Sequence, residues 1–114
     1  MWEQKEFIRP LNIYIYIYIY KNYNKKITVS ELANIANLSI SRYSSLFRKI
    51  IGVSPQQYII HYRLEKACEL MQHTNLNIKQ IAIITGFYDQ LYFSRLFKKY
   101  YKMNPSQYMK RENS

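Results

Sequence analysis

The chain contains an internal repeat, and this repeat restricts its fold more than any other feature. Residues 39–58 align with residues 89–108 at a constant offset of 50, and seven aligned positions are identical. The identical pairs are Ser44/Ser94, Leu46/Leu96, Phe47/Phe97, Lys49/Lys99, Pro55/Pro105, Gln57/Gln107 and Tyr58/Tyr108. Upstream of these segments the offset becomes 49, so one extra residue lies near Tyr88 in the second copy. Two copies of one small structural unit are therefore expected.

The first copy, about residues 28–52, predicts a short helix, a tight turn and a longer helix. Thr28, with a glutamate three residues on, forms a capping box. Asn37 tolerates the left-handed backbone of a tight turn, and Gly52 ends the second helix, about residues 39–51. The apolar residues expected on the buried faces are Leu32, Ile35, Ala36, Tyr43, Leu46, Phe47 and Ile50.

The second copy, about residues 77–102, repeats these devices. Asn77, with a glutamine three residues on, begins the short helix. Gly86 makes the turn, and the longer helix spans about residues 89–101. The apolar residues expected on its buried faces are Ile78, Ile81, Ala82, Phe93, Leu96, Phe97 and Tyr100. Each copy therefore predicts a helix-turn-helix motif.

A long helix is expected between the copies, and a short one after them. Serine, proline and two glutamines at residues 54–57 form a helix start, and the helix continues to about residue 73. Such a helix is roughly 30 Å long at ~1.5 Å per residue. Because successive major grooves on one DNA face lie roughly 34 Å apart, a helix of this length could hold the two motifs one DNA turn apart. The terminal helix is expected at about residues 104–111. The whole domain is expected to cover residues 11–114, and residues 1–10 to form a linker or tail.

Composition agrees with an all-α fold that binds nucleic acid. Only 2 glycines and 3 prolines occur, whereas a sandwich or barrel needs many tight turns. The net charge is +10, with no acidic residue between residues 37 and 62 or between residues 90 and 111. The single cysteine, Cys68, excludes an internal disulfide and fits a reducing cytoplasm. We expect a cytoplasmic protein without a membrane segment, because the apolar run at residues 13–20 is too short to span a bilayer.

The second copy resembles the DNA-binding domain of the AraC/XylS family of bacterial transcription regulators. The resemblance is carried by GFYDQLYFSRLFKK at residues 86–99, followed by Asn104-Pro105 and Tyr108. It implies about seven helices, with two helix-turn-helix units joined by a long fourth helix. It further implies transcription activation through RNA polymerase, and dimerisation, if any, through a domain outside this chain.

Three positions depart from the family pattern. Leu91 stands where a small polar residue is usual, and Ser45 where arginine is frequent. Both change which bases can be recognised. Tyr101-Lys102 replaces the glycine expected after the last recognition helix, which affects the geometry of that helix end.

Outward-facing residues of the two longer helices are the candidates for DNA contact. Arginine bonds bidentately to guanine and glutamine to adenine, and leucine can touch a thymine methyl group. The candidates for base contact are Ser41, Arg42, Ser44, Ser45, Gln90, Leu91, Tyr92 and Arg95. The candidates for phosphate contact are Arg48, Lys49, Ser94, Lys98, Lys99 and Lys102. The double-stranded DNA partner is expected to carry a bipartite operator.

No residue pattern indicates an enzyme, a metal site, a cofactor or a small-molecule effector. Glu65 and Glu69 lie four residues apart on a helix surface, and no nucleophile–base motif or phosphate-binding glycine loop occurs. His61 and His73 have no partners at ligand spacing. Cys68 is expected to be a buried small hydrophobe of the central helix, whose apolar stripe is Ile60, Leu64, Ala67 and Met71.

Residues 13–20 alternate isoleucine and tyrosine, which by periodicity predicts a strand. The resemblance places a helix there. A helix would put Ile15, Ile19 and Tyr23 on one face, and we predict a helix.

Two other functions compete with sequence-specific recognition. A nonspecific basic nucleic-acid binder would have little sequence preference, and the duplicated helix-turn-helix argues against it. A protein-interaction module would have lost the basic residues of the second helices, and they are retained.

Overall fold

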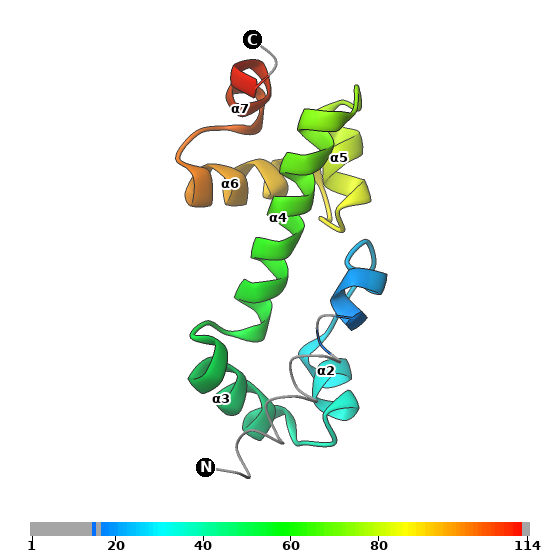
Figure 1. Ribbon diagram of the computed structural model, residues 1–114, viewed down its shortest axis with the longest axis vertical. Coiled ribbons are helices and arrows are strands. Elements are labelled where there is room, and N and C mark those ends of the chain that lie inside the picture. Colours follow the sequence, from blue (N-terminus) through cyan, green and yellow to red (C-terminus); the bar gives the residue numbers. More distant parts are fainter. Residues whose placement is uncertain (1–14, 16, 113–114) are drawn as a thin grey trace. The chain divides into compact units, whose positions relative to one another are not determined.

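The computed structural model describes residue 15 and residues 17–112, and all regular secondary structure in this part of the chain is helical (Figure 1). A helical segment covers residues 15 and 17–22. It is followed by α2 (Val29–Ile35), α3 (Ile40–Ile51), α4 (Pro55–His73), α5 (Ile78–Ile84), α6 (Gln90–Tyr101) and α7 (Pro105–Glu112). The predicted all-α fold, with two helix-turn-helix motifs and a long central helix, is confirmed. The chain divides into two compact units, Met1–Ile60 and His61–Ser114.

The core of the first unit is built on aromatic side chains of α3. Tyr43 and Phe47 are buried, with ring centroids 5.8 Å apart, and Tyr58 packs edge-on against Phe47 at 5.7 Å. Leu32 and Ala33 of α2 are buried as well. Apolar burial of this extent is the main stabilising term for so small a unit.

The first helical segment confirms the helix predicted from residue 15 on. Ile15 and Ile19 are both buried, as the four-residue spacing of one helix face requires, and Tyr23 is half-buried just beyond the segment. A strand would have placed all the isoleucines on one face, whereas Ile17 is exposed. Residues 13, 14 and 16, and the predicted linker at residues 1–10, lie outside the described residues.

The cap of α2 is tied to this segment. Thr28 Oγ1 accepts the Glu31 N–H at 3.1 Å, which is one of the two bonds of the predicted capping box. The Glu31 carboxylate accepts a hydrogen bond from the Tyr18 hydroxyl, and this bond, with a smaller effect of burial, raises the pKa of Tyr18. Glu31 therefore joins α2 to the helix before it.

The turns of the two motifs have the same hydrogen-bond pattern. The Leu38 N–H donates to the Ala33 carbonyl at 2.9 Å, and the Phe87 N–H donates to the Ala82 carbonyl at 3.0 Å. The turn residues Asn37 and Gly86 have positive φ angles of 60° and 91°. The sequence offset of 49 thus corresponds to a repeated backbone structure. The extra residue of the second copy is Tyr88, which is 92% exposed.

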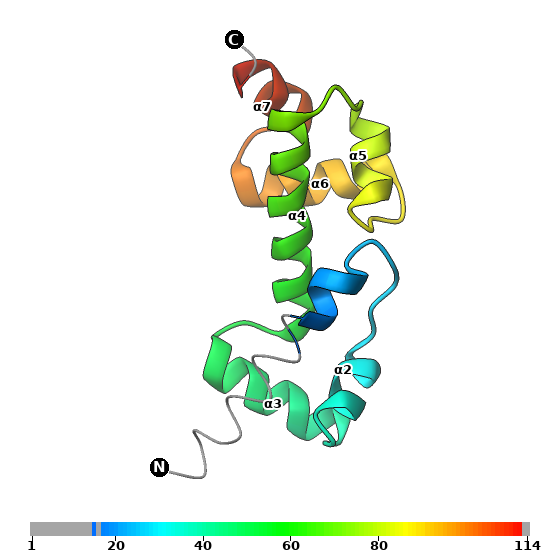
Figure 2. The same cartoon turned by 45° about the vertical axis from the view of Figure 1, so that its right-hand side comes forward.

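The core of the second unit mirrors that of the first. Phe93 and Phe97 of α6 are fully buried, and Phe87 packs on Phe93 with ring centroids 5.0 Å apart. Both views place α7 beside the carboxyl end of α4 (Figures 1 and 2), where the Gln72 amide donates to the Tyr108 hydroxyl at 3.1 Å. The repeated aromatic positions therefore support the same local fold in both units.

Reciprocal capping boxes begin three helices. Before α4, the Gln57 N–H donates to Ser54 Oγ at 3.2 Å, and the Ser54 N–H donates to Gln57 Oε1 at 3.1 Å. The same paired bonds link Asn77 with Gln80 before α5, and an asparagine with a glutamine before α7. These bonds satisfy backbone donors that a helix start leaves unpaired.

The two longer helices end in the same left-handed conformation with different residues. Gly52 has φ 96° and Lys102 has φ 65°, and each N–H bonds to the carbonyl four residues earlier. A non-glycine residue in this region is strained by roughly 1 kcal/mol. Replacement of the family's glycine by Lys102 therefore keeps the helix end but strains its backbone.

Several residues expected on buried faces are less buried than predicted. Those that are half-buried in the two motifs are Ala36, Leu46, Ile50, Ile78, Leu96 and Tyr100. Ile35 is 40% exposed, because the buried face of α2 is centred between Leu32 and Ala33, and Ile35 lies roughly 110° from that centre at ~100° per residue. Cys68 is half-buried rather than buried, since it lies at the margin of the α4 stripe. Ile60 is also half-buried. The other stripe residues of α4, Leu64, Ala67 and Met71, are buried as predicted.

Candidate nucleic-acid interface

The outward faces of α3 and α6 have the same pattern of exposure. From residue 41 to residue 50 and from residue 91 to residue 100, each position falls in the same burial class as its counterpart 50 residues away. Each helix buries two aromatic side chains, and the exposed position between them is Ser45 in α3 and Arg95 in α6. Neither helix contains an acidic residue. The arrangement gives each unit one exposed helix face suited to an anionic, hydrogen-bonding partner.

On α3, three of the four predicted base-contact residues are exposed. Ser41, Arg42 and Ser45 lie at the surface, and Ser44 is half-buried. The helix begins where Ser39 Oγ accepts the Arg42 N–H at 3.2 Å, which fixes the backbone of Arg42 while its guanidinium faces solvent. This helix therefore presents short hydroxyls and one arginine in its first two turns.

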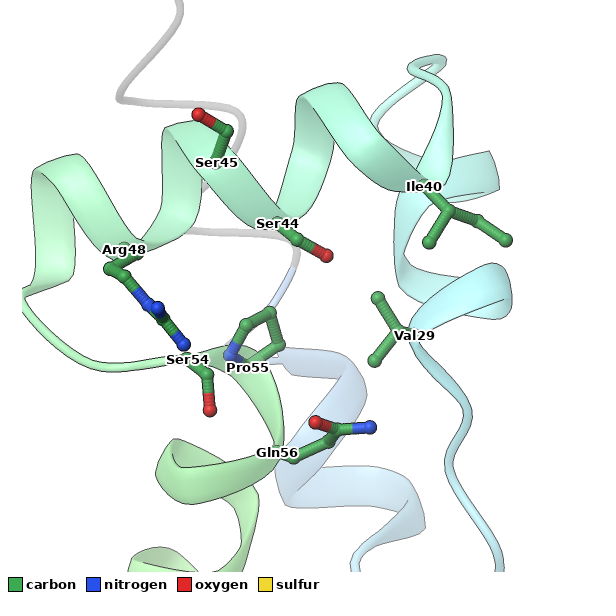
Figure 3. A pocket seen from close by; sticks show the side chains of 8 residues that line it. All are labelled: Val29, Ile40, Ser44, Ser45, Arg48, Ser54, Pro55 and Gln56. Atoms are coloured by element: carbon green, nitrogen blue, oxygen red, sulfur yellow. The ribbon is translucent and has the colours of Figure 1, made fainter.

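A pocket of about 520 Å³ separates α3 from the start of α4. Figure 3 shows Ser44 and Arg48 directed toward Pro55 and Ser54, whereas the Ser45 hydroxyl points away from them. Val29 and Ile40 close one side of the pocket. Of the two neighbouring serines, Ser45 is thus the one more open to a molecule approaching α3.

On α6, all four predicted base-contact residues are exposed. Gln90, Leu91 and Tyr92 occupy its first turn, and Arg95 follows one turn later. Asp89 Oδ1 accepts the Tyr92 N–H at 2.7 Å and so fixes the start of the helix. Compared with α3, this face carries larger side chains with more hydrogen-bonding and apolar surface.

The predicted phosphate-contact residues gather at the later turns of both helices. Arg48 and Lys49 lie in the last turn of α3, and Lys98 and Lys99 in the last turn of α6. Positive charge there complements the helix dipole. All four are exposed, as is Lys102, while Ser94 is half-buried like its counterpart in the first copy.

One exposed residue beside this surface was missed from the sequence. Tyr88 lines a pocket of about 410 Å³ together with Asp89, Leu91, Tyr92 and Arg95. Its signal was the change of offset from 49 to 50, which marks an inserted residue directly before α6. An inserted residue in a tight turn has no place in the repeated core, so its side chain projects outward.

The exposed face of α6 is backed by a partly buried cation of α4. Burial lowers the pKa of the Arg63 guanidinium, and the nearby Tyr92 hydroxyl acts in the opposite direction. Tyr92 remains 43% exposed.

The described residues contain no group of three or more histidine, cysteine or acidic side chains placed to hold a metal ion. Within the same part of the chain, every helix is too short or too polar to cross a membrane.

Comparisons with known proteins agree with this geometry. Residues 32–111 match the family model described as a helix-turn-helix domain. The lactose operon transcription activator of Staphylococcus xylosus is 37% identical over 87 residues, which cover 76% of this chain and 31% of that protein. The chain spans less than half the length of the curated relatives it matches.

Two solved structures share the fold. The C-terminal domain of the two-component response regulator yesN from Fusobacterium nucleatum has a TM-score of 0.81 at 36% identity, covering 86% of this chain and 96% of that chain. The DNA-binding domain of AdpA, solved in complex with a target DNA, has a TM-score of 0.84 over 90% of this chain and 91% of that chain. At 22% identity, this second likeness concerns the fold alone.

Proposed function

The chain belongs to the AraC/XylS family of DNA-binding transcription regulators, and we propose that it recognises specific double-stranded DNA sequences through α3 and α6. The observation that carries this proposal is the matching exposure of the two helices, with aromatic side chains buried and polar or basic ones outward. A recognition helix needs this division, because its inner face must hold the motif while its outer face reaches base edges.

The outer faces supply the two kinds of contact that DNA recognition requires. Arg95 bonds bidentately to guanine and Gln90 to adenine, while Arg42 is the strong donor of α3, at a different position of the repeat. Ser41, Ser44 and Ser45 offer single hydroxyl contacts. The residues that bond to phosphates and set the position on the duplex are Arg48, Lys49, Ser94, Lys98, Lys99 and Lys102.

We further propose a bipartite operator whose halves lie about one helical turn apart. Support comes from α4, whose 19 residues extend about 28 Å at ~1.5 Å per residue. Successive major grooves on one face of DNA lie roughly 34 Å apart. A connecting helix of this length suits two recognition helices in successive grooves.

In the cell, we propose that this domain activates transcription by contacting RNA polymerase in the cytoplasm. The name of the Staphylococcus xylosus relative, a transcription activator, supports activation. The matched relatives are more than twice as long as this chain, and we propose that dimerisation, if any, occurs through a domain outside it. No catalytic step and no cofactor is assigned to this domain.

The test is selection from a random double-stranded DNA library at near-physiological salt. Wild type should enrich a two-part motif, and Arg95→Ala should lose preference within one part only. Lys21→Ala, which removes one exposed positive charge outside both motifs, is the charge-matched control and should keep the full motif. Enrichment of no motif, with binding that only falls as salt rises, would establish a nonspecific binder instead.

A further inference from the structure

Three large exposed side chains gather where α6 begins. Tyr88 is 92% exposed, Leu91 64% and Tyr92 43%, and all three line one pocket with Asp89 and Arg95. Exposed apolar side chains that gather at one place, unlike single scattered ones, are typical of an interaction site. This cluster lies on the face that the proposed function directs toward DNA.

In the described part of the first unit, the exposed apolar residue at the start of α3 is Ile40, at 52%. Ser41 and Arg42 occupy the positions that correspond to Leu91 and Tyr92, and Tyr88 has no counterpart because it is the inserted residue. The apolar group is therefore not a requirement of the shared helix-turn-helix fold. It distinguishes the surface of α6 from that of α3.

Charge directs the pocket toward bases rather than toward phosphates. Asp89 and Arg95 are its two charged residues, so their formal charges cancel. Asp89 is also fixed at the helix start by the bond from the Tyr92 N–H at 2.7 Å, and its carboxylate would repel a phosphate. Uncompensated positive charge lies further along α6, at Lys98 and Lys99.

The major-groove edge of DNA carries one apolar group, the C5 methyl of thymine. We infer that Tyr88, Leu91 and Tyr92 form a receptor for a thymine methyl group next to the base bonded by Arg95. This inference rests on the proposed function and names a determinant of its specificity. Tyr88 was not among the residues predicted from the sequence to contact DNA, and this inference makes it a specificity-determining residue.

The experiment uses the operator obtained by the selection described above. In the half-site assigned to α6, each thymidine is replaced by deoxyuridine, one position at a time. This change removes only the methyl group. At one or two positions, the dissociation constant for wild type should rise about three- to fivefold, the expected effect of one buried methyl. Tyr88→Ala and Leu91→Ala should bind the thymine operator more weakly and should lose the difference between thymine and uracil.

Tyr20→Ala removes a tyrosine that is exposed outside both motifs, and this control should keep the difference. Both test residues are exposed, so the variants should retain the wild-type helix content and melting temperature. Unchanged affinity on every thymine replacement, or variants that still distinguish the two operators, would overturn the inference alone. Failure of selection to enrich any motif would overturn the proposed function, and this inference with it.

Discussion

The helices α3 and α6 have the same buried face and different exposed faces. Tyr43 and Phe47 in one, and Phe93 and Phe97 in the other, hold the motif by the same packing. Outward, α3 presents serines and Arg42, whereas α6 presents Gln90, Leu91, Tyr92 and Arg95. The comparison teaches that the packing which holds the motif and the surface proposed to contact DNA lie on separate faces of one repeated helix, so the exposed face can change while the buried face is kept.

The largest effect is expected from removing a shared core aromatic. Phe97→Ala leaves a cavity among Phe93, Tyr101 and Tyr108 and should reduce the free energy of unfolding by about 3–5 kcal/mol. Phe47→Ala should have a comparable effect in the first unit. Urea denaturation measures both, and Tyr88→Ala serves as the exposed control. A loss below about 1 kcal/mol would show that the buried face is not what holds the motif.

Next in size is the loss of the arginine of α6. Arg95→Ala should weaken operator binding by about 1–3 kcal/mol, because the proposed bidentate contact to guanine would be lost. The companion variant Arg42→Ala tests α3 and should have the smaller effect if α3 depends more on single hydroxyl contacts. Affinity measured by fluorescence anisotropy separates the two. A larger loss for Arg42→Ala would reverse the proposed ranking of the two helices.

The substitution Ser45→Arg tests the difference between α3 and α6 further. Ser45→Arg places arginine at the position of α3 that corresponds to Arg95, on a side chain that is exposed and directed away from the α4 start (Figure 3). It should strengthen binding to operators with a guanine at one position of the first half-site, by about 1 kcal/mol. Selection with this variant should show that new preference, and Ser45→Lys should show it less. No change in the selected motif would mean that position 45 does not reach the bases.

The smallest effect concerns the helix ends. Lys102 has a left-handed backbone with φ 65°. Lys102→Gly relieves the strain of this conformation and should stabilise the domain by up to about 1 kcal/mol. The reciprocal change Gly52→Ala should destabilise it by about 1 kcal/mol, although an added Cβ at Gly52 would meet no atom within 4 Å. Thermal melting measures both, and equal melting temperatures for all three proteins would contradict the strain argument.

The charge of Lys102 is also expected to contribute to DNA binding, and the salt dependence of binding tests this. Lys102→Gly should also reduce the salt dependence of DNA binding, by about one unit of the slope if Lys102 contacts a phosphate. The double-logarithmic plot of affinity against salt gives this slope. A parallel line for wild type and variant would remove Lys102 from the proposed phosphate contacts.

The repeat allowed most of the fold to be predicted, because identical residues in phase require equivalent packing. The turn at Asn37, the caps at Ser54 and Asn77 and the burial of Phe47 and Phe97 were all readable from local residue chemistry. These features depend on neighbours within a few positions of the chain.

Details set by contacts between helices were less accessible. The exposure of Ile35 depends on the direction in which α2 faces its unit, which the seven residues of that helix do not determine. Ser44 and Ser45 are adjacent in the sequence, and only the position of the α4 start separates their surroundings (Figure 3). The repeat located Tyr88, but only the structure placed it in a pocket with Leu91 and Arg95.

The most direct test of the central claim is binding to operators with one half-site scrambled at a time, beside the intact operator, at a single salt concentration. We expect both changes to weaken binding. Scrambling the half-site that loses its preference in the Arg95→Ala variant, and so is assigned to α6, should weaken binding more. Equal losses would contradict the ranking of the two helices, and affinity unchanged by either scrambling would contradict sequence-specific recognition itself.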